Sequence, residues 1–163
     1  MKVVRFKKSL PKNWSTHPRI KVDSEFDVRL GSLYAKVLIF KNSKDLHGWW
    51  KCKIKSHYLP KGDTLGAVNG LFYESIPQKG KPYLQVDPRY FCVIALTKNN
   101  LTMEVITHES VHAAYCFIKR KSRTPWAKLA KENDEEEVAY PAGRIAAAIN
   151  RELYKRNLYG DNQ

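Results

Sequence analysis

The sequence lacks a long hydrophobic run, and this absence argues against a membrane-spanning helix. No stretch approaches the roughly 18 to 20 consecutive apolar residues that a membrane-spanning helix requires. The opening segment, residues 1–8, is basic and lacks the apolar core of a secretory signal. We therefore expect a cytoplasmic protein with no membrane partner.

Cysteine is also scarce. The chain has three, Cys52, Cys92 and Cys116, which are far apart in the sequence and odd in number. This pattern excludes a disulfide framework and a Cys-x-x-Cys zinc ribbon. We expect all three side chains to be reduced thiols in the core.

Acidic residues are few in the first 100 positions, which contain 19 Lys and Arg but only 7 Asp and Glu, a net charge of +12. Residues 101–163 carry 10 against 9, or +1. The positive charge of this first part either keeps a surface solvated or attracts nucleic acid or an acidic protein partner. Both interpretations stay open. Five aromatic residues lie among its lysines and would suit stacking on bases: Trp49, Trp50, Tyr58, Phe72 and Tyr73.

The apolar pattern divides the 163 residues into two parts of one expected domain, 1–163. Residues 1–98 are predicted to be strand-rich and residues 99–163 helical, which makes an α+β fold. The strands are expected at 37–40, at 49–55 where lysines alternate with Trp50, Cys52 and Ile54, at 71–76 and at 90–96. The last is apolar throughout and should be buried on both faces.

The spacing of apolar residues changes after Asn100. Five residues recur three or four apart and predict one apolar stripe on a helix from near Thr102 to Lys121: Leu101, Val105, His108, His112 and Tyr115. Thr124-Pro125 is typical of a second helix start. A third helical stretch is predicted from Asp134 to Asn157.

The predicted first helix carries His108-Glu109-Ser110-Val111-His112. Histidines four residues apart lie on one side of a helix and can bind the same zinc ion. Glu109 follows the first ligand, so its carboxylate can take a proton from a water on the metal as that water attacks a carbonyl carbon. The motif predicts one zinc ion and a general base.

No histidine follows His112, so a third histidine ligand downstream is excluded. A concentration of carboxylates follows from Asp134 to Glu137, and a glutamate is the natural third ligand. Pro141 leaves two alternatives open. It either kinks a helix that includes the acidic run, or the run is a loop and the helix begins at Pro141.

From about residue 90 to 155 the chain resembles the gluzincin type of zinc metallopeptidase. It looks most like the short versions encoded by phages and prophages, in which His-Glu-x-x-His-Ala-Ala precedes an Asp-Glu-Glu run. The resemblance implies a minimal zincin-like fold, a protein or peptide substrate, and the host cytoplasm if a phage carries the gene. Many relatives place the third ligand in Glu-x-x-Ala. That spacing assigns Glu136, with Glu135 and Glu137 as alternatives.

Three further expectations concern the site. A transition state needs a donor for its oxyanion, and Tyr140, Tyr115 and Arg144 are able to supply one. In zincin-like folds a strand beside the cleft pairs with the substrate, and residues 90–96 are the nearest candidate. Alternatively, the zincin-like core is structural or repurposed, and the protein binds nucleic acid or a host protein.

Overall fold

The computed structural model describes residues 20–53, 65–70, 89–122 and 135–159. Its elements, in chain order, are β1 (Val22–Leu30), β2 (Leu33–Phe40), α1 (Ser43–Lys53), β3 (Gly66–Gly70), β4 (Tyr90–Thr97), the short 3-10 helix η1 (Lys98–Asn100), α2 (Met103–Ser122) and α4 (Glu135–Lys155). The chain therefore has the predicted α+β class.

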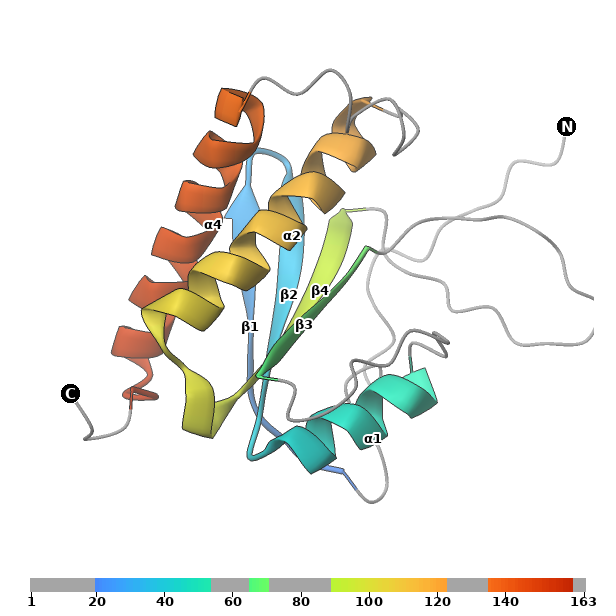
Figure 1. Ribbon diagram of the computed structural model, residues 1–163, viewed down its shortest axis with the longest axis vertical. Helices are drawn as coiled ribbons and strands as arrows, with labels where there is room; N and C mark the ends of the chain where they lie inside the picture. The colour runs from blue at the N-terminus through green and yellow to red at the C-terminus, as the bar shows by residue number, and fades with distance from the viewer. Residues whose placement is uncertain (1–19, 54–64, 71–88, 123–134, 160–163) are drawn as a thin grey trace, which may run out of the picture.

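The four strands form one mixed sheet in the order β1-β2-β4-β3 (Figure 1). β1 pairs with β2 in antiparallel fashion, through a turn at Gly31 whose φ of 64° favours glycine. β2 and β4 are parallel, and β3 and β4 are antiparallel. β4 is therefore internal, and β3 forms an edge among the described strands.

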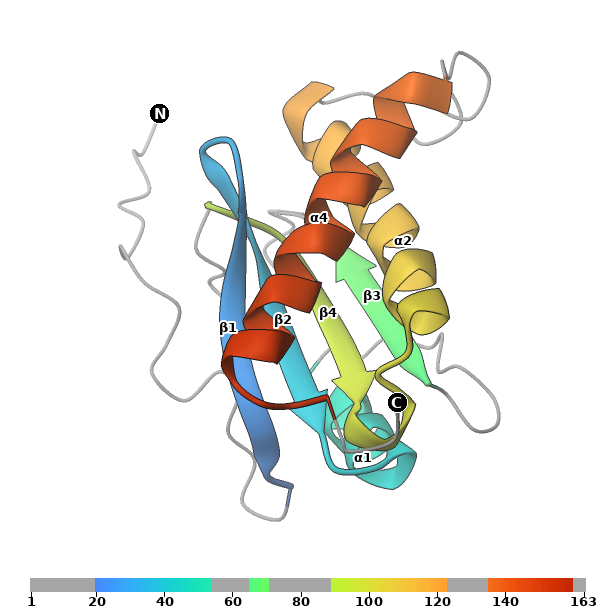
Figure 2. The ribbon, with the colours of Figure 1, turned by 90° about the vertical axis from the view of Figure 1, so that its left-hand side faces the viewer.

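Helices cover both faces of the sheet (Figure 2). α2 and α4 pack together on one face, where α4 contacts β1 and α2 contacts β3 and β4. α1 packs on the other face, against a second cluster that includes Leu38 and Val93. Because β4 lies between these two layers, all eight of its residues are buried, which confirms the prediction for 90–96.

The strand predicted at 49–55 is wrong, because residues 43–53 form α1. Three apolar side chains at helical spacing, Leu46, Trp49 and Trp50, are buried together, and a strand would turn Trp49 and Trp50 to opposite faces. The side chain of Asn42 caps the helix, since its Oδ1 accepts a hydrogen bond from the N–H of Asp45 at 3.0 Å. Lys51 is exposed, and the side chains of Lys53 and Lys55 lie outside the described residues.

The two long helices confirm the predictions for their segments. α2 spans 103–122, and α4 spans 135–155 with Pro141 inside it, so the alternative that the acidic run is a loop is wrong. Neither these helices nor α1 is long and apolar enough to cross a bilayer. The strand predicted at 71–76 and the helix start at Thr124-Pro125 lie outside the described residues.

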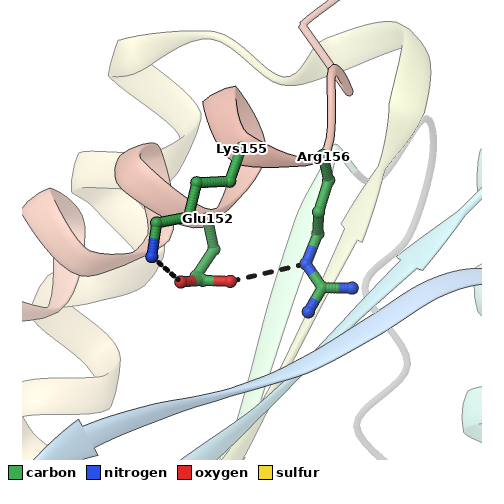
Figure 3. Close-up of polar contacts among 3 residues, drawn as sticks. All are labelled: Glu152, Lys155 and Arg156. Atoms are coloured by element: carbon green, nitrogen blue, oxygen red, sulfur yellow. Dashed lines mark hydrogen bonds and ion pairs between the residues drawn. The ribbon is translucent and has the colours of Figure 1, made fainter.

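The C-terminal end of α4 is held by a small charged cluster (Figure 3). Glu152 accepts from Lys155 Nζ at 3.2 Å and pairs with Arg156 Nε at 3.5 Å, and these partners lower the pKa of its carboxyl. The Arg156 guanidinium lies over the ring of Phe26 in β1, 5.0 Å from its centroid. This contact fixes the end of α4 against the edge of the sheet.

Candidate metal centre

Thr102 caps the first turn of α2. The Oγ1 of Thr102 accepts a hydrogen bond from the N–H of Val105 at 3.3 Å, and its carbonyl accepts one from the N–H of Ile106 at 3.0 Å. Ile106, Glu109, Ser110 and Ala113 are then buried. The side of α2 that carries Ile106, Glu109 and Ala113 therefore faces the sheet.

The prediction that His108 and His112 lie on the apolar, buried side of α2 is wrong. Both histidines are exposed, while Glu109 is only 6% exposed. The buried stripe is shifted by one position, because β3 and β4 cover the side that carries Ile106, Glu109 and Ala113. The histidines lie on a flank of α2 that the described part of the chain leaves exposed to solvent.

The two imidazoles of α2 converge. The Nε2 atoms of His108 and His112 are 3.2 Å apart, and the ring centroids are 4.8 Å apart with the planes at 73°. Two nitrogens bound to one tetrahedral zinc ion at 2.0 to 2.1 Å would be about 3.3 to 3.4 Å apart. Burial and the neighbouring His108 lower the pKa of His112, which favours the neutral imidazole that a metal requires. The pair therefore fits two positions of a zinc site.

Glu109 lies between α2 and β3. A Cβ atom at Gly66 would be 2.7 Å from Cγ of Glu109 and 3.0 Å from its Oε1, so the carboxylate rests directly against the first residue of β3. Burial raises the pKa of Glu109 from 4.5 to about 7. A carboxyl with that pKa can accept or release a proton near neutral pH.

Within residues 20–53, 65–70, 89–122 and 135–159, no three His, Cys, Asp or Glu side chains converge on a common point. Glu135, Glu136 and Glu137 are exposed on the first turn of α4. α4 runs back along α2, so this turn lies toward the C-terminal end of α2 (Figure 1). His112 is ten residues before that end, a rise of about 15 Å. The assignment of Glu136 as third ligand stays a prediction.

The remaining candidates near the motif occupy different surroundings. Tyr140 is 71% exposed on α4, Arg144 is exposed, and Tyr115 is half-buried. Cys92 and Cys116 are free and buried, as predicted for core thiols. Burial raises the pKa of the Cys116 thiol, one turn beyond His112, to about 12, so this thiol keeps its proton near neutral pH. The side chain of Cys52 lies outside the described residues.

The structure bears on one argument for nucleic-acid binding. Trp49 and Trp50 are buried against the sheet, so they cannot stack on bases. Tyr58, Phe72 and Tyr73 lie outside the described residues. Binding of nucleic acid or an acidic protein by the basic first part stays a prediction that rests on charge and on these three aromatic residues.

Two features of the site were missed by sequence reasoning. These are the contact of Gly66 with Glu109 and the burial of Glu109 itself. A glycine inside a strand often marks a close approach, and this was the signal available at Gly66. Comparisons of the chain with family models, curated proteins and solved structures found no match.

Proposed function

We propose that this chain is a zinc-dependent hydrolase that cleaves a peptide bond in a protein substrate. The observation that carries the proposal is the convergence of the Nε2 atoms of His108 and His112 at 3.2 Å, with Glu109 beside them on the same turn of α2. Two convergent imidazoles bind zinc, and the carboxylate adds the proton acceptor that hydrolysis needs.

His108 and His112 would hold the ion through Nε2. When bound, zinc supplies Lewis acidity, which lowers the pKa of a coordinated water and polarises a carbonyl oxygen. Glu136 is the proposed third ligand, with Glu135 and Glu137 as alternatives. Tyr140 is the proposed stabiliser of the transition state. Both would have to approach His108 and His112 from the first two turns of α4.

Glu109 is proposed to move the proton. Its carboxylate is buried, and burial raises its pKa to about 7, so the group would take a proton from water and return it to the leaving amine at near-neutral pH. Since the side chain rests against Gly66, the proton acceptor has a fixed place relative to the two histidines. Glu109 is therefore suited to be a general base and not a third ligand.

A peptide substrate is favoured by the position of β3. β4 is internal, so the expectation that residues 90–96 pair with the substrate is wrong. β3 forms an edge among the described strands, and its first residue contacts the side chain of Glu109. An extended peptide that adds to this edge would pass beside the proton acceptor.

The test is Glu109→Gln, which keeps the size of the side chain and removes its ability to accept a proton. Zinc content should stay near that of the wild type. Hydrolysis of a fluorescent-labelled casein substrate should fall by about 10²- to 10⁴-fold. The matched control is Glu104→Gln, an exposed glutamate on the same helix, which should leave hydrolysis unchanged. Hydrolysis that survives Glu109→Gln would exclude Glu109 as the base.

A further inference from the structure

Gly66, the first residue of β3, occupies a position where space is unusually restricted. A Cβ atom built there would be 2.7 Å from Cγ of Glu109 and 3.0 Å from both its Cδ and its Oε1. Carbon atoms that are not bonded prefer separations of about 3.5 to 4.0 Å. The side chain of Glu109 therefore fills the volume that any side chain at position 66 would need.

Backbone conformation does not account for this glycine. Among the described glycines, only Gly31 has a positive φ, so the backbone of Gly66 is open to other residues. Glycine also weakens a strand interior, because it loses more conformational freedom on folding. Space for Glu109 is the physical reason that remains.

Gly66 is itself held in place by hydrogen bonds to the residue before it. The carbonyl of Leu65 accepts from the backbone N–H of Thr97 at 3.2 Å and from Thr97 Oγ1 at 3.1 Å. Asn100 Nδ2 donates to the same hydroxyl at 3.1 Å. Thr97 is fully buried at the end of β4, from which the chain passes through η1 into α2. One short connection thus fixes both the start of β3 and the start of the helix that carries Glu109.

We propose that Gly66 is a positioning residue for Glu109. Because position 66 has no side chain, a space remains between α2 and β3 that the Glu109 carboxylate occupies, and we call this space the seat. The Thr97–Leu65 hydrogen bonds hold the start of β3 in place beside it. The functional meaning of this seat rests on the proposed role of Glu109 as proton acceptor. The seat itself is a separate claim about how positions 66 and 109 are coupled.

The coupling is tested by a double-mutant cycle in the full chain, measured by thermal unfolding without metal. Gly66→Ala should lower Tm by about 4 to 8 °C, because its Cβ overlaps the Glu109 side chain. In a Glu109→Ala background, which has no Cγ, Gly66→Ala should leave Tm unchanged or raise it. Gly143→Ala is the matched control. A Cβ atom added at Gly143 would have no neighbour within 4 Å, so this substitution should raise Tm in both backgrounds.

The position of the carboxylate is read out by carbodiimide labelling and mass spectrometry. In the wild type Glu109 should react more slowly than the exposed Glu104, and Gly66→Ala should raise its rate several-fold. Thr97→Val preserves the volume but removes the hydroxyl hydrogen bond, so it should raise the rate by less. Equal Tm changes of Gly66→Ala in both backgrounds, or an unchanged labelling rate, would overturn the proposal.

The functional arm compares zinc content and hydrolysis. Gly66→Ala should keep the zinc of the wild type, because it leaves His108 and His112 unchanged, while hydrolysis falls toward that of Glu109→Gln. Wild-type hydrolysis in Gly66→Ala would overturn the positioning role. A wild-type chain that binds no zinc would instead contradict the proposed function, and the cycle and the labelling would still decide whether the seat exists.

Discussion

The two helices that carry the predicted metal ligands differ in how far the structure assembles them. On α2, His108 and His112 converge at 3.2 Å and Glu109 is buried beside them. On α4, Glu136 and Tyr140 are exposed on the first two turns, and no described side chain joins the histidine pair as a third donor. Ligands within one helix are placed by helix geometry, whereas a ligand from a second helix depends on how the two helices pack.

The largest effect expected is the loss of metal when a histidine of α2 is removed. His108→Ala and His112→Ala should each reduce the zinc content of the purified protein from about one ion per chain toward zero, because each variant keeps only one of the two histidine ligands. Elemental analysis of the dialysed protein measures this. Thr107→Ala, at an exposed position on the same helix, is the control and should retain the metal. Zinc retained in both histidine variants would place the site elsewhere.

A smaller effect is expected from the glutamates of α4, and it decides whether the two helices act together. Glu136→Ala should weaken zinc binding in a competition titration with a chromophoric chelator, because a two-histidine site lacks its third protein ligand. Glu135→Ala and Glu137→Ala should leave the affinity unchanged. If one of these neighbours weakens binding instead, the ligand is shifted by one residue. If none does, α4 supplies no ligand.

The smallest effect concerns stability and separates Glu109 from the exposed residues of α2. The pKa of its carboxyl rises from 4.5 to about 7 on folding, so the folded chain holds this proton more tightly than the unfolded chain. The associated stability is present below about pH 4.5 and is lost as the pH rises to about 7. In metal-free protein, Glu109→Gln should therefore match the wild type near pH 4 and be about 1 to 3 kcal/mol more stable near pH 8.

Urea unfolding at the two pH values measures this difference. Glu104→Gln, at an exposed position on the same helix, is the control for removal of a carboxylate from α2. An equal effect of Glu109→Gln at pH 4 and pH 8 would show that the folded structure does not perturb this carboxyl. Increased stability on removal of Glu109 would indicate a residue kept for function at a cost to folding.

How much could be predicted from the sequence depended on whether a pattern had one physical interpretation. Residues 90–96 are apolar throughout and lie in an internal strand, and the helices at 103–122 and 135–155 were indicated by three- and four-residue spacing and by composition. The segment at 49–55 has an alternation of lysines that is typical of a strand, but residues 43–53 form a helix in which Trp49 and Trp50 are both buried. Short segments with mixed periods therefore need tertiary contacts to be assigned.

The site shows the same division. The spacing of His108 and His112 determines that they share one side of α2, but it does not determine whether that side faces the core. The contact between Glu109 and Gly66 joins residues 43 positions apart and depends on the pairing of β3 with β4. Such a contact has no periodicity in the sequence.

X-ray absorption at the zinc edge of the purified protein is the sharpest test of a metal site on α2. Imidazole scattering from two histidines, with nitrogen and oxygen neighbours of the metal at about 2.0 to 2.1 Å, is the predicted result, and the imidazole signal should disappear in His108→Ala. A spectrum dominated by sulfur at about 2.3 Å, or one unchanged in His108→Ala, would contradict a zinc site on α2.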